Sequence, residues 1–203
     1  MIAIITGDII NSVRTTGSEW MPVLKKYLSV LGTSPEDWEI YRGDEFQLKT
    51  LSESALETAI IIKALIKSIK GLDVRMGIGM GTETFKAKTI GESNGSAYQL
   101  SGRVFETLKE QHLNLAFASG SKVYDDTLNL MLKLALDFMD NWTVVSSEII
   151  ALALQNPKAS QHEIALQLHI RQSAVSQRQK RARLDLVLEV LHYYKQTIKS
   201  QVS

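Results

Sequence analysis

The first part of the chain alternates between short apolar runs and longer segments with a helical period. Short runs bounded by Gly, Asp or Asn predict strands, and apolar positions three or four residues apart predict helices. Strands are expected over 2–6, 38–41, 45–49, 74–80 and 113–118, and helices over 18–31, from Ser52 or Ser54 to 70, and over 96–111 and 122–139. The resulting order, β-α-β-β-α-β-α-β, is typical of an α+β fold with a ferredoxin-like mixed sheet.

Strand patterns stop after Asp140, and the rest of the chain has helical periods only. Helices are expected over 144–155, 161–168 and 172 to about 199. Asn156-Pro157 separates the first from the second, and a tight link at 169–171 separates the second from the third. The sequence therefore predicts two domains, an α/β domain over 1–140 and an all-helical domain over 141–203.

Charge divides at the same place. The whole chain has a net charge of +1, but residues 1–140 carry −3 and residues 141–203 carry +4. Five of the eight basic residues of the second part lie in 171–183, with no acidic residue among them. Such a stretch is typical of a nucleic-acid-binding surface, and the alternative is an ordinary solvated helix face.

The composition limits both the cellular location and the chemistry that can be expected of the protein. The chain has no cysteine, which excludes disulfides and thiolate chemistry and agrees with a cytoplasmic location. No apolar run reaches the roughly 18 residues of a membrane span, and no signal peptide opens the chain. We therefore expect no membrane partner.

Two aspartates mark a candidate site in the first domain. Asp8 follows the first strand, and Asp44 lies in the predicted hairpin turn Arg42-Gly43-Asp44. If the first strand is central and lies beside the hairpin, both carboxylates meet at one edge of the sheet. Two carboxylates suit Mg²⁺ or Mn²⁺, which bind together with substrate phosphates. The alternative is that both are ordinary turn residues, where Asp is common.

Several segments in this domain, taken in order, resemble the nucleotidyl cyclase and GGDEF superfamily, which has a palm-like fold. They are Ile5–Ser12, Tyr41–Phe46 (Tyr-Arg-Gly-Asp-Glu-Phe), Val74–Gly81, Gly95–Glu106 and Ala118–Tyr124, spread over about residues 1–130. The resemblance implies that Asp8 and Asp44, with the Ile9 carbonyl, hold Mg²⁺ or Mn²⁺. It also implies that the turn of Ile10, Asn11 and Ser12 binds phosphates of a nucleotide.

The same resemblance assigns Gln99 and Arg103 to the triphosphate, with Arg103 stabilising charge on the transferring phosphoryl group. Two residues depart from the pattern. Gln99 stands where cyclases carry Asn, and Arg42 replaces a glycine beside the nucleotide, which argues against the guanine pose of diguanylate cyclases. The resemblance thus implies a nucleotide and metal site more strongly than it implies any particular reaction. The alternative is a degenerate cyclase fold in which the two aspartates have only a structural role.

Residues 160–183 have the spacing of a helix-turn-helix. Ser160 and Glu163 form a capping box, while Ile164, Ala165 and Val175 point inward. The segment resembles the helix-turn-helix of bacterial regulators. Its second helix is expected to place Gln172, Ser173, Ser176, Gln177 and Lys180 in the major groove, with Arg171, Arg178, Arg181 and Arg183 on phosphates. The alternative is a helical module that contacts protein.

The C-terminal helix carries a further apolar pattern. Leu184, Val187, Leu191, Tyr194 and Ile198 recur at a/d-like spacing over about two heptads. They form either the seam of a homodimer or a face that packs on 144–154 of the same chain.

The whole chain resembles the SatD family, in the segments Gly-Asp-Ile, Arg-Gly-Asp-Glu-Phe and Ser-Gly-Arg. That resemblance implies the two-domain architecture and no particular reaction. The function predicted is a bacterial transcriptional regulator that binds double-stranded DNA and senses a nucleoside triphosphate or related phosphate ligand. One alternative is an active nucleotidyl cyclase or oligonucleotide synthase regulated by its helix-turn-helix, and another is a protein-interaction module.

Overall fold

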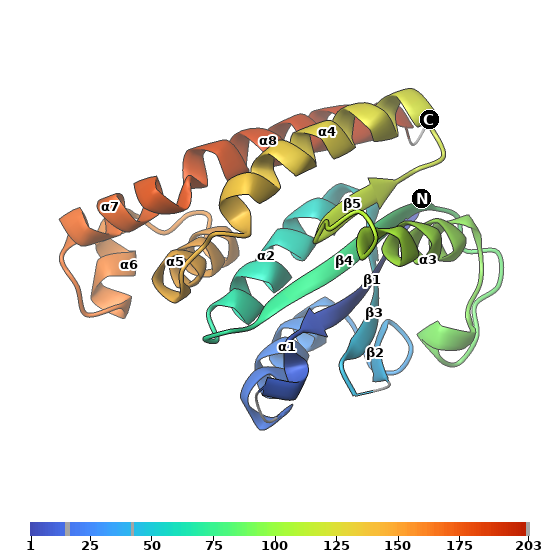
Figure 1. Ribbon diagram of the computed structural model, residues 1–203, viewed down its shortest axis with the longest axis horizontal. Coiled ribbons are helices and arrows are strands. Elements are labelled where there is room, and N and C mark those ends of the chain that lie inside the picture. The colour runs from blue at the N-terminus through green and yellow to red at the C-terminus, as the bar shows by residue number, and fades with distance from the viewer. Residues whose placement is uncertain (15–16, 42, 202–203) are drawn as a thin grey trace.

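The chain builds a five-stranded mixed sheet with helices on both faces (Figure 1). The computed structural model describes residues 1–14, 17–41 and 43–201. The strand order is β2-β3-β1-β4-β5, with β4 and β5 parallel and the other neighbours antiparallel. The strands are β1 (Ile2–Ile10), β2 (Trp38–Tyr41), β3 (Glu45–Leu51), β4 (Asp73–Gly81) and β5 (Leu115–Ala118). The predicted α+β class and element order are confirmed.

Four helices connect and follow these strands. They are α1 (Gly17–Leu31), α2 (Ala55–Lys67), α3 (Ser96–Leu108) and α4 (Lys122–Met139). Because side chains alternate along a strand, β1 has two distinct faces. Ala3, Ile5 and Ile9 share a core with α1, α2 and α4, whereas Ile4 packs against Ala97 of α3. Helix α3 thus covers one face of the sheet and the other three cover the opposite face.

Glycines set how closely these elements approach. A Cβ on Gly79 of β4 would lie 2.2 Å from the backbone nitrogen of Ser101 in α3, so only glycine lets α3 approach this strand so closely. The first strand was expected to end near residue 6, with Gly7 and Asp8 as its stop, and this was wrong. Gly7 lies inside β1, where a Cβ would come within 2.8 Å of the Arg75 carbonyl, so glycine allows close packing there and does not break the strand.

The C-terminal segment is entirely helical, as expected. It contains α5 (Val144–Gln155), α6 (Gln161–Gln167), α7 (Gln172–Ala182) and α8 (Leu184–Thr197). The single helix predicted from 172 to about 199 is wrong, because Arg183 adopts a left-handed conformation (φ 57°) between α7 and α8. The Trp142 indole N–H donates to the Ala182 carbonyl over 2.8 Å at this break. No Gly or Pro marks the break in the sequence.

The apolar face of α8 is buried within its own chain. Val187, Leu191, Tyr194 and Ile198 belong to the main core. Apart from the segments next to it in the chain, α8 contacts α4, α2 and the short 3-10 turn Ser52–Ser54, and the Tyr194 hydroxyl donates to the Ser52 carbonyl over 2.5 Å. These residues therefore form an intramolecular face, although α8 does not pack chiefly on 144–154 as one alternative proposed.

Ion pairs fix the junction near residue 140, where a domain boundary was predicted. Lys63 of α2 is fully buried, with its ammonium 2.8 Å from Asp73 and 2.6 Å from Asp140 Oδ1. Oδ1 accepts no hydrogen bond of good geometry from any described residue, so this contact is an ion pair alone. Lys67 reaches Asp73 over 3.0 Å and the Asp140 carbonyl over 2.7 Å. The core continues across the junction, with α5 packed on α2.

Candidate functional site

The two predicted acidic residues lie at the same end of neighbouring strands. Strand β1 is central, and Asp8 pairs with Glu45 of β3 on one side and Arg75 of β4 on the other. The Ile9 N–H donates to the Asp44 carbonyl over 3.1 Å, which places Asp44 beside Ile9. The backbone arrangement expected for Asp8 and Asp44 is therefore present at this edge.

Their side chains, however, already have partners. Arg75 Nε and Nη2 donate to the two oxygens of Asp8 over 3.1 and 3.0 Å, a bidentate and charge-assisted contact. The Ser12 hydroxyl donates to Asp44 Oδ2. No group of three or more His, Cys, Asp or Glu side chains among the described residues could hold a metal ion. As placed, the pair does not fit Mg²⁺ or Mn²⁺, because the Arg75 guanidinium stands where a cation would bind Asp8.

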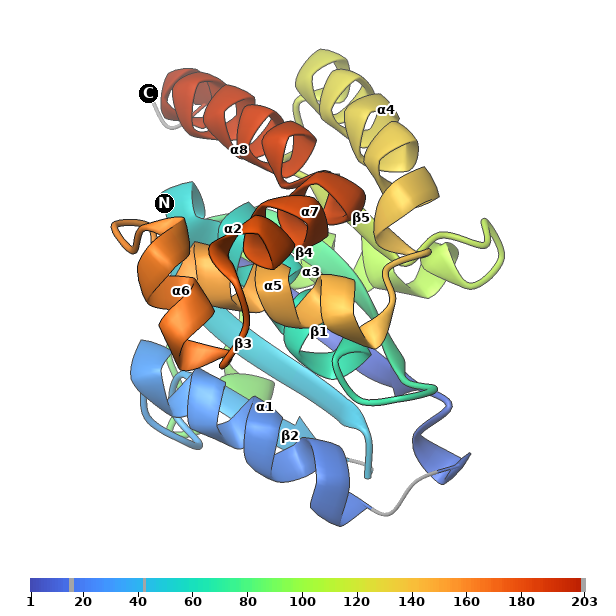
Figure 2. The same ribbon diagram turned by 90° about the vertical axis from the view of Figure 1, so that its left-hand side faces the viewer.

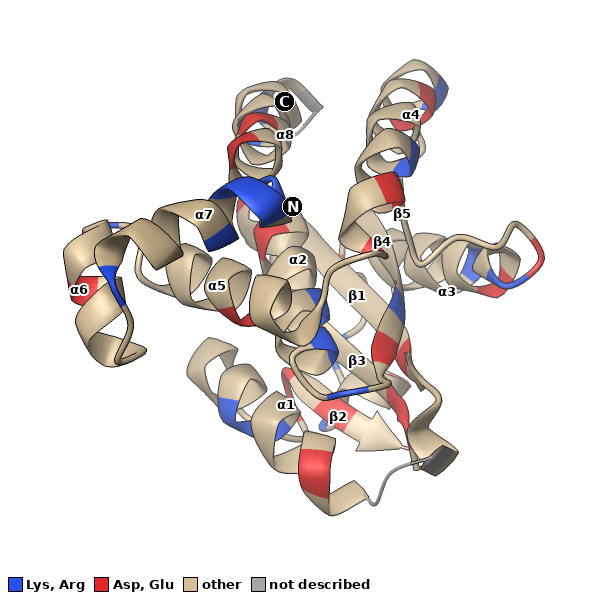
Figure 3. Cartoon of the chain, turned by 60° about the vertical axis from the view of Figure 1, so that its left-hand side comes forward, with Lys and Arg blue, Asp and Glu red and all other residues tan. Residues whose placement is uncertain are grey.

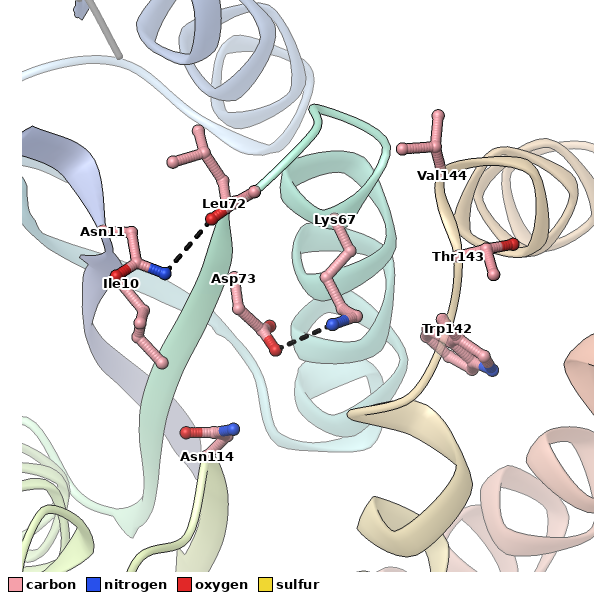
Figure 4. A pocket seen from close by; sticks show the side chains of 10 residues that line it. Ile10, Asn11, Lys67, Leu72, Asp73, Asn114, Trp142, Thr143 and Val144 are labelled. Atoms are coloured by element: carbon pink, nitrogen blue, oxygen red, sulfur yellow. Dashed lines mark hydrogen bonds and ion pairs between the residues drawn. The ribbon is translucent and has the colours of Figure 1, made fainter. Parts of the chain in front are cut away.

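The predicted phosphate turn is divided between two cavities. Ile10 and Asn11 line one of about 580 Å³, together with Lys67, Asp73 and Trp142 (Figure 4). Asn11 is left-handed (φ 65°), and its side-chain amide donates to the Gly71 carbonyl over 3.1 Å. Lys67 and Asp73 face each other across this cavity and neutralise each other, so its walls favour neither sign of charge.

Ser12 and Asp44 line the second cavity, of about 400 Å³, beside Trp20 at the start of α1. Gln99 and Arg103 lie one turn apart on the exposed side of α3. The opposite side of α3, which carries Ala97 and Ser101, packs on the sheet. No hydrogen bond or ion pair among the described residues joins Gln99 or Arg103 to Asp8 or Asp44. Arg42 lies outside the described residues.

The helix-turn-helix spacing corresponds to three packed helices, α5, α6 and α7 (Figure 2). The capping box is formed: the Glu163 carboxylate accepts from the Ser160 N–H over 2.7 Å, and the Ser160 hydroxyl accepts from the Glu163 N–H over 3.2 Å. The Ser160 backbone and hydroxyl lower the pKa of Glu163. The cap is therefore fully formed at neutral pH and weakens as the pH falls through that lowered pKa.

A Schellman motif makes the turn between α6 and α7. His169 is left-handed (φ 53°), and the Ile170 N–H donates to the Ala165 carbonyl over 3.0 Å. Ile164 and Ala165 of α6 and Val175 of α7 are buried in the core. The turn and these three anchors fix the orientation of α7 relative to α6.

All five residues predicted to face the major groove lie on the exposed side of α7. They are Gln172, Ser173, Ser176, Gln177 and Lys180. Val175 and Ala182 anchor the opposite side. The amide of Gln172 donates to the Gln161 side chain, which in turn donates to Gln179 over 2.7 Å, so a chain of glutamines holds the start of α7 on α6.

The predicted phosphate contacts are less uniform. Arg171 and Arg181 are exposed, and Arg183 is about half exposed (51%). Arg178 is partly covered and lies 3.9 Å from Glu148 of α5, so it also ties α7 to α5. Figure 3 shows basic segments where α6 leads into α7 and where α7 leads into α8. Basic residues thus flank both ends of the exposed face of α7.

A family model describing the SatD family matches residues 1–198. The chain belongs to the SatD family. No curated protein matches the chain significantly. None of the helices in the described part of the chain has the length and apolar character that crossing a bilayer needs.

Two residues of this SatD-family protein were not predicted as site residues. Arg75 and Glu45 lie directly opposite Asp8 in register, so all three side chains project from the same face of the sheet. A signal was present for Arg75, because it is the one charged residue in an otherwise apolar and glycine-rich stretch, Val74 to Gly81. Pairing it with Asp8 needed the strand register, which the sequence alone does not supply.

Proposed function

We propose that this SatD-family protein is a DNA-binding transcriptional regulator whose helix α7 enters the major groove. One observation carries the proposal: the exposed face of α7 holds only polar and basic residues, and its opposite face is anchored by Val175 and Ala182. A recognition helix needs this combination, because its outer face must read bases while its inner face fixes the docking angle. Gln side chains pair with adenine and Lys with guanine.

Phosphate contacts would hold the protein in register on the duplex. Arg171, Arg181 and Arg183 are exposed and flank the reading face at both ends. Such contacts release bound counterions and make binding depend on salt. A module that contacts protein would show no such dependence on duplex DNA.

This difference can be measured by fluorescence anisotropy with the full chain and a labelled mixed-sequence duplex. The logarithm of the binding constant should fall with the logarithm of salt, with a slope of about −3 if three phosphates are contacted. Arg181→Ala should make that slope shallower by about 1. Lys88→Ala is the matched control, because Lys88 is exposed on a loop of the sheet domain. A slope near zero for the unaltered chain contradicts DNA binding.

Nucleotide binding at the acidic edge is a second proposal, supported by the adjacent placement of Asp8 and Asp44. The cavity beside Ser12 and Asp44 offers space at the start of α1, and positive backbone dipoles at such a position favour phosphates. The other cavity suggests how a ligand could affect DNA binding. Trp142 lines it and also bonds the last residue of α7.

Calorimetry with ATP or GTP tests this second proposal, with and without Mn²⁺. Saturable binding that weakens at least about tenfold in Ser12→Ala is expected, since a hydrogen bond to a charged phosphate is worth roughly 1.5–3 kcal/mol. Pyrophosphate release that depends on Asp44 would favour the alternative of an active cyclase or oligonucleotide synthase. Equal dissociation constants for the variant and the unaltered chain would exclude this edge as the binding site.

A further inference from the structure

Helix α4 is apolar on two sides. One side, which includes Leu128 and Leu132, is buried in the core. On the outer side Val123, Leu130 and Leu134 are 81%, 60% and 68% exposed. With Thr127 these exposed positions are spaced four, three and four residues apart, which is the spacing of a helix-pairing seam.

The apolar surface extends from α4 onto α8. The two helices run side by side along one edge of the molecule (Figures 1 and 2). A groove of about 400 Å³ lies between them, lined chiefly by Met131, Leu134, Phe138, Leu186, Val190 and Tyr193. Soluble monomers rarely leave so continuous an apolar patch exposed, so this one calls for a partner.

Charged residues beside the exposed apolar positions of α4 indicate which partner binds there. Lys122, Asp126, Lys133 and Asp137 are spaced four, seven and four residues apart, so they lie on one side of α4, and their signs alternate. A parallel pairing of two α4 helices about a two-fold axis would place this charged side against the opposite, apolar side of the partner helix, which carries the equivalents of Met131 and Phe138. An antiparallel pairing about an axis near residue 129 places the two charged sides together and brings opposite charges face to face, because Asp126 and Lys133, like Lys122 and Asp137, lie at nearly equal distances on either side of that axis.

We propose that two copies of this chain pair through α4 and α8, with the two α4 helices antiparallel about a two-fold axis. Asp126 then faces Lys133 of the partner subunit, and Lys122 faces the partner's Asp137, with each contact made twice. The interface is self-complementary, as a two-fold axis requires. Leu130 and Leu134 fill its apolar centre, together with the groove residues of α8.

The pairing has a consequence for DNA recognition that rests on the proposed function, although the dimer itself does not. A two-fold axis through this interface would present two copies of α7 to one duplex, as dimeric helix-turn-helix proteins do at paired half-sites.

Sedimentation velocity and light scattering of the full chain at micromolar concentrations test the dimer. The unaltered chain should be a dimer, and Leu134→Glu should raise its dissociation constant at least about a hundredfold by placing charge in the apolar centre. Val30→Glu is the matched control and should leave the dimer intact, because Val30 is 78% exposed on α1. An unaltered chain that sediments as a monomer overturns the proposal, and so does a dimer that Leu134→Glu leaves intact.

Charge reversal tests the antiparallel register itself. Asp126→Lys and Lys133→Asp should each weaken the dimer about tenfold, since each creates two like-charge contacts. The double variant D126K/K133D restores opposite charges in both contacts and should recover dimerisation. All three variants change exposed positions, so the thermal midpoint of each variant reports that it is folded. A double variant that dimerises no better than the single ones overturns the antiparallel pairing.

Discussion

Gln177→Glu should weaken binding to duplex DNA by about ten- to a hundredfold while leaving the fold unchanged. Gln177 lies on the exposed face of α7 between Val175 and Lys180. A carboxylate there would lose the amide that pairs with adenine and would stand close to the phosphate backbone. Losing one good base contact costs about 1–3 kcal/mol, and the negative charge adds repulsion.

Gln196→Glu provides the matched control. Gln196 is an exposed glutamine on α8, outside the helix-turn-helix, so the same chemical change there should leave DNA affinity within about twofold. Anisotropy with one labelled duplex at one salt concentration compares the two variants directly. Equal affinities for Gln177→Glu and Gln196→Glu would show that α7 is not the reading element.

Lys63→Met should lower the free energy of unfolding by about 3–5 kcal/mol, because it removes one partner of a buried ion-pair network. The Lys63 ammonium is fully buried and contacts Asp73 and Asp140, which join α2, β4 and the end of α4. The methionine fills a similar volume, so the loss arises from the carboxylates left without their cation. Asp140 is the more affected of the two, since Asp73 keeps Lys67.

Urea denaturation followed by circular dichroism measures this effect. Lys70→Met is the control, since Lys70 is exposed just beyond α2 and the change should cost less than about 0.5 kcal/mol. A midpoint for Lys63→Met equal to that of the control would show that the network contributes nothing to holding the sheet against the C-terminal helices.

Local patterns in the sequence were sufficient to predict most of the helices and strands. The helix from 144 to 155 and the hairpin of 38–41 and 45–49 depend on periodicity and turn residues, and both are present with β3 two residues longer. The errors arose where tertiary contacts decide. Gly7 reads as a strand end, but it serves close packing against Arg75 of β4.

The break at Arg183 has a similar cause. Neither Gly nor Pro marks it, and it lies where Trp142, forty residues earlier, bonds the Ala182 carbonyl. The position of Asp8 and Asp44 at one edge of the sheet was predictable, because each follows or precedes a predicted strand. The contact between Arg75 and Asp8 was not, because it depends on the register of two strands far apart in the chain.

Recognition of DNA through α7 can be tested by selection from a pool of random duplexes with the full chain. A recurring DNA sequence should be enriched, and Gln172→Ala/Gln177→Ala should abolish the enrichment while remaining folded. Failure of the unaltered chain to enrich any sequence, or equal enrichment by the double variant, would contradict recognition of DNA through α7.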